Sequence, residues 1–543
     1  MRRLGLLVSL SVLGAMVALP MATSSAAPAH PLGKYTVKKG AITIKDWRVL
    51  SSGGKAFFLG PQGTSPKVTS PLDHPSFGTN VDANDPQKDL AAGQSETAVA
   101  ASGNNVVAAW NDASGFFSGS TTSRLNLSGV AFSGDGGTTW NDLLGLANNN
   151  AKQGWFGDPT AVAIDGTHFL VGGLYLPAAF AGGQFSCHSH LQLAVDVLTV
   201  VGGNKVSMSH PIVAADGGSI CDPTAAFLDK EWLSFDPTTR TLSLSYTAFA
   251  FNPPLHCGNG EIDLARATVP ADPKDLGKSS FQQIVVWPEE GADCSSTPVE
   301  NEGAYSTVAP NGDTYVAWER NWFTNLFNGD PFAYMKTALI PAGSPSPTTI
   351  VTASLGQPNG NGIGGVKSTD FVVIAGYNRG IGNDFPRIAY DAPAGKVLVE
   401  WNDASRHALG DIFMKSLAPD LSDNATAPIN WVNDDHTSYA LHFLPAISVR
   451  AGGAICSSWY DRRLSGADSA VTDVFRDCRG SPGTNTTDSR VTTGGSNWTN
   501  TSTIIIPNFG DYTDNTSTGS KTYYIWSDGR LGTPQPFADH NGA

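Results

Sequence analysis

The sequence predicts an all-β protein: a β-propeller of six or seven blades, seven favoured, in which each blade is a four-stranded antiparallel sheet. One hairpin pattern recurs along the chain, which indicates a repeat architecture. No stretch after the first 29 residues shows the 3.6-residue apolar period of a helix of normal length. With 59 glycines, 34 prolines and only 15% charged residues, the composition is also typical of a large, turn-rich β protein.

The recurring hairpin is clearest in the stretch NDFPRIAYDAPAGKVLVEWND. It predicts two strands, Arg387–Asp391 and Lys396–Trp401, joined by Ala-Pro-Ala-Gly. An acid precedes the first strand, and an aromatic-x-Asp sequence closes the second. Small alternating residues such as Ala98 and Ala100 suit an inner strand close to a propeller axis. The seven copies span Ser95–Asp112, Gly157–Tyr175, Asp229–Phe249, Glu300–Asn321, Asn383–Asp403, His442–Arg463 and Phe509–Arg530.

The spacing of the copies indicates a propeller of large blades. Successive copies start about 70 residues apart on average, which leaves room for two more strands and long loops in each unit. This spacing is too short for a row of separate β-sandwich domains. The second, third and seventh copies match less closely, so six blades remain the alternative.

Residues 1–29 have the pattern of a secretory signal peptide. Two arginines precede the apolar run Leu4–Met21, small residues follow it, and cleavage is expected after Ala29. The apolar run is short for a membrane anchor, and no second long run follows. We therefore expect a secreted, extracellular protein that does not insert into a membrane.

Residues 30–90 are predicted to be an N-terminal extension. They are rich in proline, glycine and serine and contain one strand-like run, Ala41–Leu50. We expect one strand of this extension to close the propeller, which residues 91–543 otherwise form.

The charge of the chain argues against nucleic acid as a partner. It carries 34 Lys and Arg against 48 Asp and Glu, a formal net charge of -14. A protein without excess cations cannot displace the counterions of nucleic acid or of an anionic membrane. We therefore expect neither partner, and we expect a monomer.

Six cysteines in an exported chain predict disulfides. Six cysteines allow fifteen pairings, and short loops favour joining nearest neighbours. We therefore expect the pairs Cys187–Cys221, Cys257–Cys294 and Cys456–Cys478.

The stretch Ser133-Gly-Asp135-Gly-Gly137-Thr-Thr-Trp140 follows a predicted strand, Ser128–Phe132. It resembles the Asp box (BNR repeat) of the sialidase-like propellers, including their secreted bacterial members. The resemblance implies a turn between the third and fourth strands of a blade, on the face opposite the active site. Asp135 would accept amide protons of this turn while Trp140 packs under the sheet.

Charged residues at the start of the first strand of each hairpin are expected to converge on one face of the axis. Crowded carboxyl groups raise one another's pKa, which suits a general acid, or they bind a cation such as Ca²⁺. Alternatively, each acid caps the turn before its own strand and points sideways. The set comprises Glu96, Asp158, Asp229, Glu302, Asp384, His442 and Asp511.

A second set of polar residues follows the aromatic residue at the end of the second strand. An Asp there can cap its own loop and pair with a nearby Arg, so most of the set is expected to be structural. One or two members could still contact a ligand. The set comprises Asn111-Asp112, Glu319-Arg320, Asn402-Asp403, Asp461-Arg462-Arg463 and Asp528-Gly-Arg530.

The resemblance to sialidases implies particular residues for catalysis. Family members use a Tyr nucleophile activated by a Glu, an acid/base Asp and three Arg that hold the sugar carboxylate. Glu302 opens the fourth hairpin and Arg320 closes it, which resembles the family segment that carries the activating Glu and one of the three Arg. Tyr512 resembles the nucleophile, and Asp112 could match the acid/base Asp.

The chain departs from the family at the first blade, where Gln94-Ser-Glu96-Thr replaces an Arg-Ile-Pro. The similar Phe385-Pro-Arg387-Ile lies in the fifth unit, with its order changed. A Glu at an Arg position would repel sialic acid, which favours a related activity on a different glycan. The resemblance thus implies a glycan or glycoconjugate as the partner.

Two hypotheses follow from these residues. The first is a secreted exo-glycosidase of sialidase-like build, with Glu302 and Tyr512 as the nucleophile pair and Asp112 as acid/base. It predicts the Tyr512 hydroxyl within hydrogen-bond reach of Glu302. Its substrate contacts are Arg320, Arg387, Glu96, Asp158, Asp384 and Asp511.

The second hypothesis is a non-catalytic propeller that binds a cation, a surface glycan or a protein. It predicts that the acids cluster without a Tyr–Glu pair or a group of arginines. No cofactor is required under either hypothesis, although the acids could take calcium.

Overall fold

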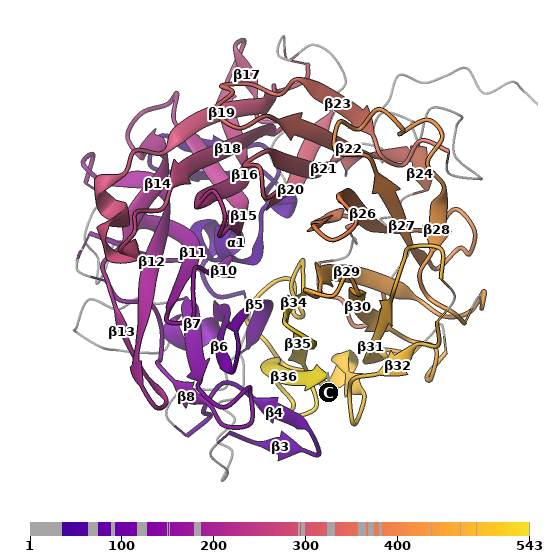
Figure 1. Cartoon of the computed structure of the whole chain (residues 1–543). Helices are drawn as coiled ribbons and strands as arrows, with labels where there is room; N and C mark the ends of the chain where they lie inside the picture. Colours follow the sequence, from indigo (N-terminus) through magenta and orange to yellow (C-terminus); the bar gives the residue numbers. More distant parts are fainter. Residues whose placement is uncertain are drawn as a thin grey trace, which may run out of the picture.

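The computed structural model has seven sheets arranged around a central axis, as Figure 1 shows, which confirms the seven-bladed propeller. Each predicted hairpin supplies the two innermost strands of one blade, with its first strand next to the axis. The structure describes residues 35–62, 74–87, 93–116, 127–148, 150, 152–178, 186–291, 294, 299–322, 332–356, 365–367, 374–379, 383–435, 437–466, 469–484 and 486–541. The predicted signal peptide lies outside them.

The blades follow one another in chain order, and the strands of each run from the axis outward. Blade 1 is β5 (Gln94–Ser102), β6 (Asn105–Asp112), β7 (Ser128–Ser133) and β8 (Asn141–Asp142). Blade 2 is β10 (Thr160–Ala163), β11 (His168–Pro177), β12 (His190–Gly202) and β13 (Lys205–Met208), with β9 (Gln153–Trp155) and β14 (Ile212–Ser219) alongside. Blade 3 is β15 (Ala226–Asp236), β16 (Thr241–Asn252), β18 (Glu261–Thr268) and β19 (Gln282–Trp287), with β17 (His256–Cys257).

Blade 4 is β20 (Glu300–Val308), β21 (Thr314–Trp322), β22 (Phe332–Ile340) and β23 (Thr349–Thr352), with β24 (Gly365–Lys367). Blade 5 is β25 (Arg387–Asp391), β26 (Lys396–Asp403), β27 (Asp411–Leu417) and β28 (Ile429–Trp431). Blade 6 is β29 (His442–Val449), β30 (Ile455–Asp461), β31 (Val471–Arg479) and β32 (Ser489–Arg490), with β33 (Ser496–Asn497). Blade 7 is β34 (Asp514–Thr518), β35 (Lys521–Asp528), β36 (Gln535–Asn541), β4 (Asn80–Asp82) and β3 (Ser76–Phe77).

The aromatic residue near the end of the second strand anchors most blades in the core. In five blades it is a fully buried tryptophan, and packing of such large side chains between sheets is a major source of stability. Trp110, for example, lies directly against Gly129 of β7, where a side chain would have no room. The five are Trp110, Trp318, Trp401, Trp459 and Trp526.

The Asp two positions after this tryptophan caps the following loop, as predicted for most of the second set. Its Oδ1 accepts the backbone N–H two residues further on, at 2.7–3.0 Å, in each of four blades. The Oδ2 atoms of Asp461 and Asp528 also accept the indole N–H of their own tryptophan. The four caps are Asp112, Asp403, Asp461 and Asp528.

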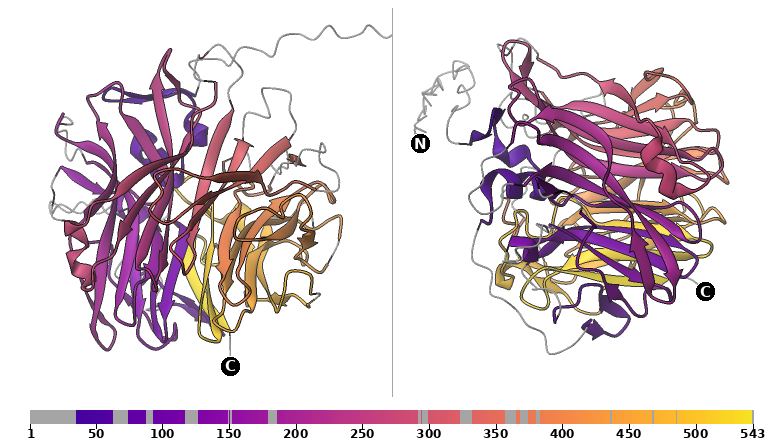
Figure 2. Two further views of the ribbon diagram at one scale, coloured as in Figure 1. Left: turned by 45° about the horizontal axis from the view of Figure 1, so that its top comes forward. Right: turned by 90° about the vertical axis from the view of Figure 1, so that its left-hand side faces the viewer.

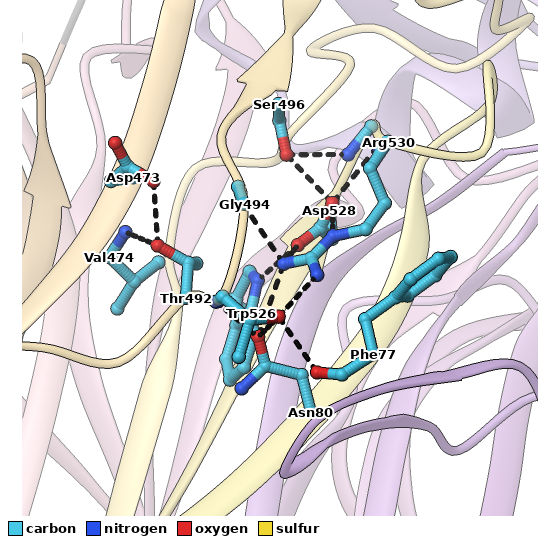
Figure 3. Close-up of polar contacts among 12 residues, drawn as sticks. Phe77, Asn80, Asp473, Val474, Thr492, Gly494, Ser496, Trp526, Asp528 and Arg530 are labelled. Carbon is cyan, nitrogen blue, oxygen red and sulfur yellow. Dashed lines mark hydrogen bonds and ion pairs between the residues drawn. The ribbon is translucent and has the colours of Figure 1, made fainter.

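Two short strands from the N-terminal part of the chain complete the last blade and so close the ring. β4 pairs with β36, so residues from both ends of the chain share one sheet (Figure 1). The buried Asn80 fixes β4 in place: it accepts from Thr493 N at 2.7 Å and from Arg530 Nη2 at 3.2 Å. Figure 3 shows Arg530 bridging Asp528 and Asn80 beside Phe77.

The strand-like run Ala41–Leu50 does not take part in this closure. It contains β2 (Ile42–Ile44), which pairs with β1 (Val37–Lys39) in a separate two-stranded sheet, and the 3₁₀ turn η1 (Trp47–Val49). The helix α1 (Ser52–Leu59) follows directly, and the sequence did not predict it. In the right-hand view of Figure 2, these indigo elements lie at one face of the propeller.

Further 3₁₀ turns are η2 (Ala113–Phe116), η3 (Pro273–Lys278) and η5 (Trp498–Asn500). The turn at Ser133–Trp140 joins the third and fourth strands of blade 1. Asp135 Oδ1 accepts from Thr138 N at 3.1 Å and from Thr139 N at 2.9 Å, while Trp140 is buried in the core.

All three predicted disulfides are present, namely Cys187–Cys221, Cys257–Cys294 and Cys456–Cys478. Disulfides of this kind fit an extracellular protein. Among the described residues, no helix has the length and apolar character needed to cross a membrane.

We predict that Asn80→Ala weakens the closure of the ring. The change removes the acceptor of the Thr493 N–H group and of Arg530 Nη2, both in part-buried hydrogen bonds, at a cost of about 0.5–1.5 kcal/mol for each bond. Thermal unfolding followed by circular dichroism should therefore show a lower midpoint. Asn311→Ala, at an exposed hairpin turn, is the control and should change the free energy of unfolding by no more than about 0.5 kcal/mol. Equal effects of the two changes would contradict the role given to Asn80.

Candidate functional site

The candidate site lies where the innermost strands begin, at the face that carries α1. Four of these strands have a β-bulge near their start, located between Ser95 and Ala98, Asp229 and Trp232, Glu302 and Tyr305, and Phe443 and Ala446. A bulge redirects side chains that would otherwise alternate regularly. Left-handed residues, with φ between 52° and 68°, lie at these bulges and just before the first strand of blade 2: Glu96, Asp158, Lys230, Gly303 and Leu444.

Acids do gather at the axis, with a membership that differs from the predicted set. Six carboxyl groups interact there, all of them buried, and one of them, Glu231, was not predicted. The six are Glu96, Asp158, Asp229, Glu231, Glu302 and Asp511. We call these acids, together with the three cations described below, the axial cluster.

Two predicted members of the ring make their contacts elsewhere. Asp384 accepts from the side-chain amide of Asn402 in its own blade and donates its backbone N–H to Glu319 of blade 4 at 3.1 Å. His442 lies in blade 6, with Nε2 3.1 Å from Asp435 and 3.4 Å from Asp461. The seven predicted positions are therefore not equivalent in the structure, because the bulges shift the register by a residue or more from blade to blade.

Three buried cations that the sequence analysis missed oppose the acids. Lys230 and Arg379 both form ion pairs with Asp511, one on each carboxylate oxygen. Tyr377 and Asn383 add hydrogen bonds to Asp511 at 3.1 and 3.2 Å. The third cation, Lys55 of α1, is buried and interacts with Asp511 and Glu96.

The first turn of α1 binds three of the carboxylates directly. Ser51 N donates to Asp229 Oδ2 at 2.9 Å, Ser52 Oγ donates to Glu96 Oε1 at 2.9 Å, and Gly53 N donates to Asp158 Oδ1 at 3.0 Å. The free N–H groups and dipole of a helix N-terminus favour negative charge at this end. The segment 46–60, which we call the axial plug, therefore closes this face of the axis.

Glycine is required in the plug because the backbone approaches the acids so closely. A Cβ at Gly53 would lie 2.3 Å from Phe156 O and 2.8 Å from Asp158 Oδ1. At Gly54 it would lie 3.2 Å from Asp229 Oδ2. Phe57, on the same helix, is fully buried and its ring stacks on Phe227 with a centroid separation of 6.0 Å. The plug is thus fitted to the axis by shape as well as by charge.

Burial shifts the ionisation of the cluster towards neutral forms. Burial, together with neighbouring acids, raises the pKa of Asp158, Glu231 and Glu302 well above the usual values. Burial also lowers the pKa of Lys55 to about 7, assisted by Arg379. Conversely, the pKa of Asp511 is depressed despite its burial, because Arg379 and Lys230 stabilise the carboxylate.

Two of these carboxyl groups have no hydrogen-bond partner within the described part of the chain. Both side-chain oxygens of Glu302 and both of Glu231 are buried and unbonded, and so is Oδ2 of Asp158. A buried polar group in this condition costs stability and is unusual in a folded protein. Groups of this type are frequent at functional sites, where a displaced pKa serves chemistry.

The predicted Tyr512–Glu302 hydrogen bond is absent. Tyr512 is buried and its hydroxyl donates to Pro159 O at 2.9 Å, while the Glu302 carboxyl group is unbonded. Burial and the nearby Glu96 and Asp158 raise the pKa of Tyr512 well above its usual value. This environment stabilises the neutral phenol, which is the opposite of what an activated nucleophile needs.

Two other predicted site residues have structural contacts. Asp112 is buried and caps its loop through Ser114 N and Oγ. Arg320 forms a two-pronged ion pair with Glu290, at 2.7 Å for each contact. Asn111, which precedes Asp112, does reach the cluster: it donates to Glu96 Oε2 and accepts from Asp158 N, both at 2.6 Å.

Arg387 lies in a channel that runs along the axis on the side opposite the plug. Its guanidinium group is 4.1 Å from the ring centroids of both Trp232 and Tyr305 and 3.2 Å from Asp514 Oδ1. The expected group of arginines is therefore not assembled, because Arg320 and Arg387 have separate partners.

No set of three or more His, Cys, Asp or Glu side chains within the described ranges is arranged to hold a metal ion. The axial acids contact lysine, arginine and backbone N–H groups instead. These contacts offset part of the negative charge of the acids.

The sequence carried a signal for the plug that pattern analysis overlooked. Ser51 precedes the helix and accepts from Gly54 N at 2.9 Å, which is an ordinary serine N-cap. The helix itself is two turns long and contains two glycines, so no apolar period marks it. Lys230 and Arg379 could not have been assigned because their carboxylate partner, Asp511, is distant in sequence.

No family model matches the chain, and no curated protein matches it. Among solved structures, a protein of unknown function from Dyadobacter fermentans is 15% identical with a TM-score of 0.41, over 72% of this chain and 96% of its own. An α-L-arabinofuranosidase of Fusarium graminearum in complex with arabinobiose is 12% identical with a TM-score of 0.38, over 88% of this chain and 98% of its own.

Trypanosoma rangeli sialidase, in complex with the inhibitor DANA, is 10% identical with a TM-score of 0.34. The match covers 70% of this chain and 54% of the sialidase, so the chain spans about half of that protein. With TM-scores of 0.41 or less, these likenesses carry no conclusion about this chain, and its chemistry has to be derived from the axial cluster.

We predict that Glu302→Gln stabilises the protein more as the pH rises. The folded chain holds a proton on Glu302 that the unfolded chain releases above about pH 4.3, so the wild type loses stability above that pH. The neutral glutamine removes this loss. Thermal midpoints measured between about pH 5 and pH 8 should show a growing advantage for the variant.

Asp275→Asn is the matched control, because the Asp275 side chain is 49% exposed. Its effect should be small across the same pH range. A Glu302→Gln advantage that shrinks as the pH rises would show that Glu302 is ionised in the folded protein.

Proposed function

We propose that the chain is a secreted hydrolase acting on glycans, with the axial cluster as its reactive centre and the axial plug in its closed position. The observation that carries the proposal is the pair of fully buried carboxyl groups, Glu302 and Glu231, that lack a hydrogen-bond partner among the described residues. A carboxyl group kept protonated near neutral pH is what a glycosidase uses as general acid.

Glu302 and Asp511 are the best-suited members of the cluster for two opposite roles. The pKa of Glu302 is raised, chiefly by burial, whereas the pKa of Asp511 is depressed by Arg379 and Lys230 despite its burial. Two carboxyl groups whose environments separate their pKa values are typical of a general acid and an ionised partner. Tyr512 is not needed for this chemistry, so the substrate need not be sialic acid.

Access to these groups requires the plug to move. Ser51, Ser52 and Gly53 occupy the carboxylates that a sugar hydroxyl would contact, and the side chains of the cluster are buried. The plug enters the fold from the N-terminal side and is not a strand of any blade. Its displacement would therefore leave the seven sheets intact.

A second function is a non-catalytic propeller whose axial cluster is a structural lock. The hydrogen bond of Tyr512 to Pro159, together with the cover that α1 provides, favours this alternative. In that case a glycan, a cation or a protein would bind elsewhere on the propeller. An assay of glycoside hydrolysis separates the two functions.

We predict that Gly53→Val activates the protein towards glycosides. The valine side chain would clash with Phe156 O and Asp158, which displaces the plug from the cluster. Release of nitrophenol from a panel of chromogenic glycosides, including an α-L-arabinofuranoside and a sialoside, should rise at least about tenfold as the open state becomes populated. The panel is run with and without calcium.

The double variant Gly53→Val with Glu302→Gln should lose this activity by a factor of about 10²–10⁴, the usual contribution of a general acid. Gly452→Val, at an open position, is the control for the effect of an added side chain. If Gly53→Val stays folded and releases no sugar from any glycoside, the non-catalytic alternative stands.

A further inference from the structure

A channel of about 300 Å³ occupies the axis on the side opposite the plug. All seven innermost strands line it, from Val99 of β5 to Asp514 and Ser517 of β34. It is a separate space from the axial cluster, because its lining residues follow the cluster residues along each innermost strand. A volume of this size is at the lower end of those that hold small ligands.

The walls of the channel carry hydroxyl groups on several strands. Ser234 and Ser306 are 3.1 Å apart, and Ser448 and Ser517 are 2.8 Å apart, on opposite sides of the ring of strands. Each of these hydroxyls can both donate and accept, so a ligand hydroxyl entering the channel would find partners of either kind.

Arg387 is the charged group that the channel offers to a ligand. Its side chain is 5% exposed, and its guanidinium group packs against the rings of Trp232 and Tyr305, which contact each other edge to face. One guanidinium nitrogen, Nη2, is 3.2 Å from Asp514 Oδ1, and the other, Nη1, has no hydrogen-bond partner among the described residues. A buried guanidinium with an unused N–H face is costly, and it matches the two oxygens of a carboxylate.

The acids near Arg387 in the described part of the chain form no hydrogen bond with its Nη1. Asp514 accepts on its other oxygen from Val99 N at 3.0 Å, which holds its carboxyl group against β5. Glu400, the cross-strand neighbour of Arg387, accepts from Ser457 of blade 6. Nη1 therefore has no carboxylate partner among the described residues.

We propose that the channel binds a small hydroxycarboxylate anion, with its carboxylate on Arg387 and its hydroxyl groups on the serines of the wall. The contacts with Trp232 and Tyr305 restrict the motion of the guanidinium group, which favours a defined orientation of the carboxylate. The site is independent of the proposed hydrolase activity, because no residue of the axial cluster lines it.

Glycolate, a hydroxycarboxylate, and glycolamide, its neutral analogue of the same shape, test the proposal. Thermal unfolding of the full chain is followed as each compound is added, with ionic strength held constant by sodium chloride. Glycolate should raise the midpoint in a saturable manner, and glycolamide should not. Equal effects of the two compounds, or no saturable effect of glycolate, would overturn the proposal.

Two variants assign the binding to the channel. Arg387→Gln should weaken glycolate binding about tenfold or more, the cost of losing a charge-assisted hydrogen bond. Thr307→Trp narrows the channel without changing Arg387 and should also abolish glycolate binding. This variant tests whether the channel is the binding site even if Arg387→Gln does not fold. Thr426→Trp, on an exposed turn, is the matched control and should bind glycolate as the wild type does. Undiminished binding by Thr307→Trp would place the ligand elsewhere.

Discussion

Six carboxyl groups buried around one axis cannot all be ionised, and the structure of the whole central region follows from this constraint. Three cations, a helix N-terminus and proton uptake together offset the charge. The negative charge of Asp511 is the most fully offset, since Lys230, Arg379 and two hydrogen bonds converge on its carboxylate. Removing one partner from such a buried group is far more damaging than its net contribution to stability suggests.

The bulges and the plug are two parts of the same arrangement. A regular inner strand would point alternate side chains to opposite faces of the sheet. The left-handed backbone of Glu96 and Asp158 redirects their side chains, at a cost of about 1–3 kcal/mol each. In return, their carboxylates meet the first turn of α1, where Gly53 allows the backbone to come within hydrogen-bond distance. Strained residues, unbonded carboxyl groups and a fitted cover occur at one place, and the proposed function rests on this coincidence.

The success of the sequence analysis depended on how local each signal was. The hairpins, the buried tryptophans and the Asp caps are encoded within a few residues, so the blade pattern and the role of Asp461 or Asp528 could be predicted. The cluster is not local. Its cations come from α1, β15 and the loop before β25, and no pattern in the sequence links Lys55, Lys230 and Arg379 to Asp511. Arg387 and Tyr512 were identified as notable, but their partners depended on bulges that sequence does not mark.

The two ends of the axis are chemically different, and this difference bears on how the propeller can work. At the plugged end, acids outnumber cations and the backbone of α1 supplies the missing positive charge. At the open end, the Arg387 guanidinium group lies beside Asp514 among hydroxyl groups, and its Nη1 has no hydrogen bond among the described residues. If the channel binds an anion as proposed, the acids beyond Arg387 would repel that anion and confine it to this end. The axis is thus divided into two separate sites, and a ligand for one is chemically unsuited to the other.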